Sequence, residues 1–160
     1  MVKYSDPELI DLIDAGTVVK SGHSDIIVIV SDELVHMISL VGENASKEET
    51  VQDAVDGLTS IGGIIHSVKL SANRLSICFT HDPLTALKAL HGVLIHHGLK
   101  CINLKENLKQ ITAYGRELGE IKSKIKGLMD KPDVHNVYIN PTRITLTVDQ
   151  TSVDEITELL

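Results

Sequence analysis

The stretch VGENASKEE, residues 41–49, combines residue types that can bind a small charged ligand. Gly42 ends a predicted strand and a predicted helix follows, so free backbone amides would gather at a helix N-terminus. Such a place favours an anionic group, for example the α-carboxylate of an amino acid. In the same loop as Ala45, Asn44 would hydrogen-bond the ligand and Glu43 would meet an α-ammonium group. The alternative is an ordinary capped loop between a strand and a helix.

Eight histidines raise the question of a metal site. His91, His96 and His97 are close in sequence, and His36 and His66 lie on predicted strands. No H-x-x-x-H pair stands with a carboxylate on one helical face, as a zinc site on a helix would need. No Ser-His-Asp or Cys-His order indicates catalysis either. The sequence therefore predicts a chain that is not an enzyme, with no metal and no cofactor.

An internal repeat gives the first clue to the scaffold. Residues 71–90 align with residues 140–159, and the alignment places Arg74 on Arg143 and keeps the apolar positions of both segments. The two arginines are expected to pair with carboxylates at the starts of equivalent strands, or Arg74 contacts a ligand. The repeat indicates two copies of one structural unit.

The first copy has the element order βαββαβ. Its strands are predicted at residues 33–43, 64–70, 74–80 and 100–104. Ser46 and Glu49 have the spacing of a capping box before the first helix. Asp82 and Pro83 form an N-cap and first position for the second helix. The buried stripe of that second helix is expected to contain Leu84, Leu87, Leu90 and Leu94.

The second copy repeats this order without its last strand. Strands are predicted at residues 109–115, 134–139 and 143–149, with a final helix capped by Thr151. A helix between the first two strands is indicated by the apolar stripe Leu118, Ile121, Ile125 and Leu128. The apolar run DIIVIV, residues 25–30, has no place in the first copy and reads as a strand buried on both faces. We expect it to complete the second copy; the alternative is a local hairpin with residues 33–41.

These elements predict an α+β protein of two ferredoxin-like βαββαβ modules packed side by side, the first inserted in the second. Residues 33–105 would form the first module, and residues 25–31 plus 106–160 the second. Residues 1–24 would form a helical lead-in.

Amino-acid composition indicates which classes of partner and which compartment to expect. A net charge of −7 and an aromatic content of 2% argue against nucleic acid and an anionic membrane surface as partners. The isolated Cys78 and Cys101 read as small buried hydrophobic residues of a reducing compartment. The amino-terminal residues 1–16 resemble no signal peptide. We expect a cytoplasmic protein.

Two tandem units of this kind resemble paired ACT domains, the small-molecule sensor modules of amino-acid metabolism. The segment SANRLSICFTHDPLTALKALHGVL and the junction HHGLKCINLKENLKQITAYGRE, residues 71–94 and 96–117, resemble the regulatory half of aspartokinases most. The first loop departs from the family pattern, as does Asn73-Arg74, where lysine-sensing members tend to have Ser-Glu.

This resemblance implies an allosteric region of an aspartate kinase in amino-acid biosynthesis, without the catalytic domain. Its implied partners are a free amino acid effector, lysine or threonine, the kinase catalytic domain and a second copy of the chain in a homodimer. The implied pocket takes backbone from the second strand, often across a module interface, and adds Asn73 to the loop residues. The residues implied on that strand are Ile65, His66, Ser67 and Val68. The alternative is a ligand-free ACT-like module for dimerisation or protein interaction.

Overall fold

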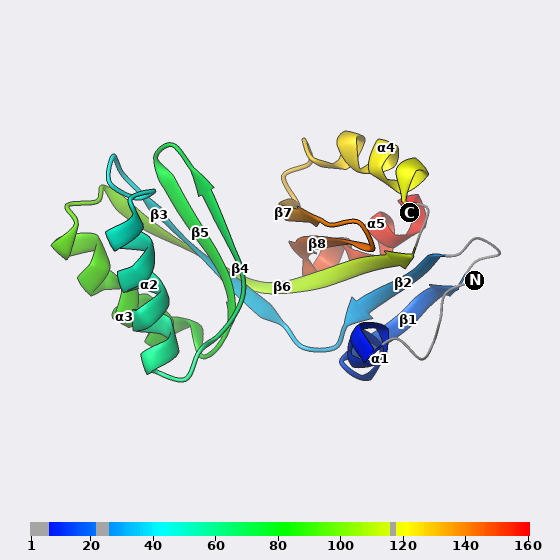
Figure 1. Cartoon of the computed structure of the whole chain (residues 1–160), viewed down its shortest axis with the longest axis horizontal. Coiled ribbons are helices and arrows are strands. Elements are labelled where there is room, and N and C mark those ends of the chain that lie inside the picture. Colours follow the sequence, from blue (N-terminus) through cyan, green and yellow to red (C-terminus); the bar gives the residue numbers. More distant parts are fainter. Residues whose placement is uncertain (1–6, 22–25, 116–117) are drawn as a thin grey trace. The chain divides into compact units, whose positions relative to one another are not determined.

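The structure, a computed structural model, describes residues 7–21, 26–115 and 118–160 (Figure 1). The chain forms two compact units, one made of residues 35–107 and the other of residues 1–34 and 108–160. Each unit has its own apolar core, and strand β6 (Cys101–Gly115) contributes to both.

The unit of residues 35–107 is a four-stranded sheet with two helices on one face (Figure 1). In chain order its elements are β3 (Val35–Val41), α2 (Glu48–Ser60), β4 (Ile64–Ser71), β5 (Arg74–Thr80), α3 (Pro83–His96) and the first part of β6. The strand order β6-β3-β5-β4 is that of a ferredoxin-like unit. The strand residues Ile38, Leu40, Leu75, Ile77 and Phe79 occupy every second position of β3 and β5, so they share one face of the sheet and pack against the helices.

The other unit contains five strands in the order β1-β2-β6-β8-β7. Its elements are α1 (Pro7–Asp14), β1 (Gly16–Ser21), β2 (Ile26–Ser31), the second part of β6, α4 (Gly119–Leu128), β7 (Val134–Ile139), β8 (Arg143–Asp149), the 3₁₀ turn η1 (Gln150–Ser152) and α5 (Val153–Leu159). Helices α4 and α5 share one core with the sheet.

Strand β2 completes this second unit. It pairs antiparallel with β6, with Val28 opposite Ala113, and takes the place of the strand that the second copy lacks. Val28 and Val30 pack into the core beneath α4 and α5, whereas Ile27 and Ile29 pack with α1 on the opposite face. The predicted insertion of the first module in the second, and the predicted burial of this strand on both faces, are confirmed.

Two segments differ from the expected elements. The helical lead-in was predicted for residues 1–24, of which residues 7–21 are described. Within these, Pro7–Asp14 is helical as predicted, whereas Gly16–Ser21 forms an edge strand on β2. The rest of the predicted lead-in lies outside the described residues. The strands predicted at 100–104 and 109–115 are one strand, β6, which continues through Asn107 although this residue has a left-handed conformation (φ 60°).

Helix caps were predicted with mixed success. Asp82 caps α3 as predicted, and its carboxylate accepts a hydrogen bond from the Thr85 amide at 3.0 Å. The capping box was wrong, because α2 starts one residue later and the Ser46 hydroxyl donates to the Ala72 carbonyl oxygen. Thr151 does not cap the last helix either; it lies inside η1.

Two buried positions were also predicted wrongly. Leu84 is 60% exposed, because α3 turns Ala86, Leu90 and Val93 toward the core. Cys101 is exposed near the start of β6, whereas Cys78 is buried as expected.

Candidate functional site

The candidate site is the loop of residues 42–47 between β3 and α2, called loop 42–47 below. A side chain at Gly42 would place its Cβ 3.0 Å from the Leu99 Cα, a contact tighter than side chains normally make, so glycine lets the two backbones approach without displacing either. The Gly42 amide donates to the Asn73 carbonyl oxygen at 2.9 Å, and the Ser46 hydroxyl bonds the neighbouring carbonyl of Ala72. The loop is therefore tied to the turn between β4 and β5.

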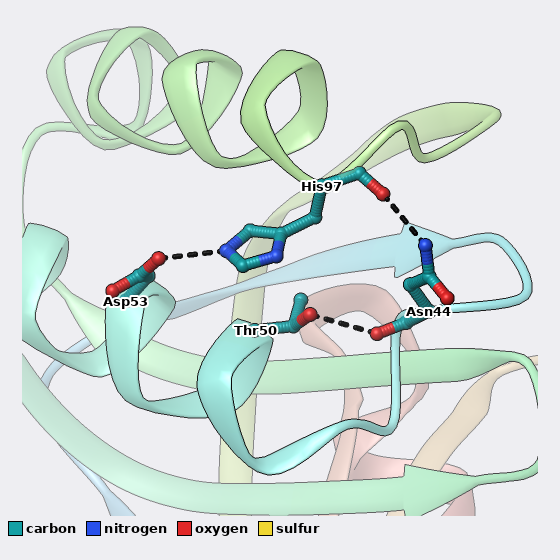
Figure 2. A network of polar contacts seen from close by, with 4 residues as sticks. All are labelled: Asn44, Thr50, Asp53 and His97. Atoms are coloured by element: carbon teal, nitrogen blue, oxygen red, sulfur yellow. Dashed lines mark hydrogen bonds and ion pairs between the residues drawn. The ribbon is translucent and has the colours of Figure 1, made fainter.

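A network of polar contacts fixes the loop to both helices (Figure 2). The Asn44 side-chain amide donates to the His97 carbonyl oxygen at 3.0 Å, just after the end of α3. The Asn44 carbonyl oxygen accepts a hydrogen bond of 2.7 Å from the hydroxyl of Thr50, which is fully buried. The His97 ring in turn contacts the Asp53 carboxylate at 2.7 Å. Asn44 is thus held from two sides in one orientation.

Backbone donors remain free in this loop. Within the described residues, the amide groups of Glu43, Asn44 and Ser46 donate to no protein acceptor. Lys47, the N-cap of α2, makes no capping hydrogen bond through its side chain. The loop therefore presents several N–H groups where the helix dipole also favours negative charge.

Charged residues flank these amides in the sequence. Glu43, Glu48 and Glu49 are three exposed carboxylates beside the single ammonium group of Lys47, a formal charge of −2. Such a surface, with donors from the backbone and carboxylates from side chains, suits a ligand that carries both charges better than a simple anion.

The structure brings together five of the nine predicted site residues. Gly42, Glu43, Asn44 and Ala45 form the loop, with Ala45 fully buried beneath it, and Asn73 bonds Gly42.

The four residues predicted on the second strand lie elsewhere. They are on β4, and Val68 is opposite Ile77, which is opposite Ile38 on β3. Strand spacings of about 4.8 Å and a rise of about 3.3 Å per residue place Val68 roughly 14 Å from the end of β3. The His66 ring contacts the Thr80 hydroxyl at 2.6 Å. Within one unit, loop 42–47 and residues 65–68 do not line one site.

Sequence reasoning missed Thr50, Asp53 and His97 as supports of the loop. Asp53 and His97 are 44 residues apart, and neither lies in a motif. The only local signal was the spacing of Asn44 and Thr50, which puts a hydroxyl one turn into the helix after an asparagine.

The histidines also form a group that the sequence did not predict. Asp53, His96 and His97 each offer a ligand atom within 4.8 Å of the other two. The expectation of no metal site required the carboxylate on the same helix, but here it comes from α2. His91 is exposed on α3, and the His36 ring accepts a hydrogen bond from the Asn107 amide.

One carboxyl group has a shifted pKa. Hydrogen bonds from the Thr85 hydroxyl and the Thr85 amide lower the pKa of Asp82 below its ordinary value of 3.8. This carboxylate stabilises the start of α3. It lies after the far end of β5, away from loop 42–47.

Comparison with known proteins finds similarity in structure only. No protein-family profile matches the sequence, and no curated protein is similar to it in sequence. No helix in the described part of the chain is long and apolar enough to cross a membrane.

Several crystal structures share the fold. The regulatory subunit of aspartate kinase from Thermus thermophilus, in its ligand-free form, matches with a TM-score of 0.66 at 16% identity, over 82% of this chain and 93% of that one. The regulatory subunit from Thermus flavus has a TM-score of 0.66 at 14% identity, over 85% and 94% of the two chains. The aspartate kinase of Clostridium acetobutylicum has a TM-score of 0.70 at 10% identity, over 88% of this chain and 35% of the enzyme. The chain therefore has the ACT-type fold of the regulatory subunits and regulatory domains of aspartate kinase, as the sequence predicted.

Proposed function

We propose that this chain is a regulatory module of an aspartate kinase that binds a free amino acid at loop 42–47. The observation that carries the proposal is the set of three free amides beside the N-terminus of α2, in a chain with this regulatory fold. The module does no chemistry itself, and its partner is the kinase catalytic domain. It acts in the cytoplasm, where amino acids are synthesised.

The loop has groups for both charges of an amino acid. The α-carboxylate accepts hydrogen bonds from the amides of Glu43, Asn44 and Ser46. The α-ammonium group meets the exposed carboxylate of Glu43. By the resemblance the effector is lysine or threonine. Asn73 and the exposed Arg74 lie at the turn bonded to the loop, so their side chains are placed to read the effector's own side chain.

A second copy of the chain would complete the pocket. Residues 65–68 lie on β4, an edge strand of its unit, and roughly 14 Å or more separates them from loop 42–47. Edge strands carry unpaired backbone groups that another chain can extend. A homodimer that brings β4 of one copy to the loop of the other joins the two halves of the site.

Binding of an effector at a site shared by two modules can regulate the kinase catalytic domain. An effector that contacts both the loop and a neighbouring module binds more tightly to the arrangement of modules in which both contacts can form. The difference in effector affinity between two arrangements is the coupling free energy that reaches the catalytic domain. Typical values of about 1 to 3 kcal/mol change the partner's ligand affinity roughly 5- to 150-fold.

A thermal-shift screen of the purified chain against the common amino acids tests this proposal. An effector at 100 times its Kd stabilises the folded state by about 2.7 kcal/mol. For a chain of this size, that free energy raises Tm by roughly 5 to 11 °C. Glu43→Gln should reduce the rise, because it removes the carboxylate that meets the ammonium group. Glu106→Gln, at an exposed position on β6, is the matched control and should leave it unchanged. The absence of a rise with any amino acid at millimolar concentration would exclude ligand binding.

A ligand-free dimerisation module is the second candidate. The observation in its favour is the apolar surface of β4, where Ile64, Val68 and Leu70 are 59%, 41% and 50% exposed. Sedimentation separates the two candidates. A dimer that forms equally with and without every amino acid, together with no thermal shift, supports the second.

A further inference from the structure

A compact group of metal-ligating side chains lies between α2 and the end of α3. Asp53 is in the second turn of α2, His96 is the last residue of α3, and His97 is the C-cap of α3. One ligand atom of each lies within 4.8 Å of those of the other two. The group therefore joins two helices that are far apart in sequence.

The group rests on a fixed scaffold. The backbone amide of His97 donates to the Val93 carbonyl oxygen at 3.1 Å. Figure 2 shows that the His97 carbonyl oxygen accepts a hydrogen bond from the Asn44 side chain. The His97 side chain is only 14% exposed and already faces Asp53. Two ligands of the group are thus oriented before any ion arrives, which lowers the entropy lost on binding.

The side chains of Asp53 and His96 have room to change conformation. An ion with ligand bonds of 2.0 to 2.2 Å needs its ligand atoms about 3.3 to 3.5 Å apart. The Asp53 carboxylate is 48% exposed and His96 is exposed, so a change of rotamer in each can bring the ligand atoms to this separation. The rings of His96 and His97 lie edge to face with centroids 4.8 Å apart. The geometry is close to that of a three-ligand site with water in the remaining position.

The chemistry of the group selects the kind of ion. Two imidazoles and one carboxylate suit Zn²⁺, Ni²⁺ or Cu²⁺ and provide too few oxygen atoms for Ca²⁺ or Mg²⁺. The position after the last turn of α3 also favours positive charge, because the helix dipole is negative there.

We propose that Asp53, His96 and His97 form a binding site for a divalent transition-metal ion, with Zn²⁺ as the representative ion. Coordination replaces the hydrogen bond between His97 and Asp53 and links α2 to α3. This site does not depend on the proposed amino-acid effector.

Zinc binding to the full chain, measured in competition with a chromophoric chelator, tests the proposal. One Zn²⁺ should bind per chain, and His96→Ala and Asp53→Asn should each weaken binding at least tenfold. His96→Ala is the cleaner variant, because the His96 side chain is exposed and makes no hydrogen bond within the described part of the chain. The matched control is His91→Ala, on the same helix and outside the group, which should bind zinc as the unmodified chain does.

Co²⁺ gives a second readout that does not depend on affinity. Its visible absorption should show a single site in the unmodified chain and in His91→Ala, and the spectrum should be lost in His96→Ala and Asp53→Asn. Circular dichroism confirms that each variant is folded. Failure of the unmodified chain to bind zinc, or equal zinc binding in all variants, would overturn the proposal and leave Asp53 and His97 as a structural pair only.

Discussion

Replacing Val28 with alanine tests whether β2 belongs to the carboxy-terminal unit. Val28 is 2% exposed and packs into the core that α4 and α5 form with β6 and β8. Alanine removes two methyl groups, which is about 1.6 kcal/mol of transfer free energy. The cavity adds roughly 1 kcal/mol if the core does not collapse. The free energy of unfolding of this unit should therefore fall by about 2 to 3 kcal/mol.

Amide hydrogen exchange measures this change segment by segment. A loss of 2 to 3 kcal/mol corresponds to exchange about 30 to 150 times faster, since each 1.4 kcal/mol is a factor of ten. The faster exchange should appear in residues 134–149, which are more than 100 residues away in sequence, while residues 74–80 keep their protection. Val93→Ala makes the same change in the core of the other unit and should give the opposite pattern.

One pattern of hydrogen exchange would refute the assignment of β2 to the carboxy-terminal unit. If Val28→Ala leaves 134–149 protected and speeds exchange only in residues 35–41, then β2 is a local partner of β3. The insertion topology and the fold assignment would then be wrong.

The further predictions concern four single positions. Gly16→Ala should destabilise the chain by about 1 to 3 kcal/mol in urea unfolding, because the new Cβ would lie 2.5 Å from a backbone oxygen of β2. Gly92→Ala, in α3 with no atom within 4 Å of the new Cβ, should instead stabilise the chain by up to about 1 kcal/mol. A Gly16→Ala variant more stable than Gly92→Ala would contradict the packing described around these two glycines. Thr50→Val should cost about 1 to 2 kcal/mol in the same assay, because it removes a buried hydrogen bond to the Asn44 carbonyl oxygen, and an unchanged midpoint would count against the network. Asp82→Ala should lower Tm at neutral pH. Because the folded-state pKa of Asp82 is lowered, the difference in Tm between the unmodified chain and the variant should shrink as the pH falls below 3.8 and through the folded pKa. A difference in Tm that does not change with pH would argue against a cap by the ionised carboxylate.

Most of the fold followed from apolar periodicity. Both β-β turns lie where the pattern put them, because alternating aliphatic residues can bury only one face of a sheet. The predicted helices are also present, although the buried face of α3 is shifted away from Leu84. The missing strand could be identified since an apolar run such as residues 25–30 has to be covered on both sides.

The errors have local causes. Strand β1 was missed because Val18 and Val19 are both exposed on an edge, so the segment shows no alternation. The long β6 was split in two because the polar residues 105–107 look like a loop, whereas the strand continues through them, with Asn107 in a left-handed conformation. The capping box failed because Ser46 found a partner in another turn, which no local pattern reveals.

The candidate site was predictable only in part. Loop 42–47 stood out through its glycine and the helix that follows. The contacts that hold it, from Thr50 and His97, depend on how α2 and α3 pack, and so does the Asp53 and His97 pair. A single sequence carries no local signal for such contacts.

The most direct test of the central claim is an NMR titration of the isotope-labelled chain with lysine and with threonine. Binding at loop 42–47 should shift the amide signals of Glu43, Asn44 and Ser46, together with Asn73, in a saturable way. The signals of residues 143–149 should stay in place unless the second unit also binds. Saturable shifts confined to other residues, or no shifts with either amino acid at millimolar concentration, would contradict an effector site in this loop.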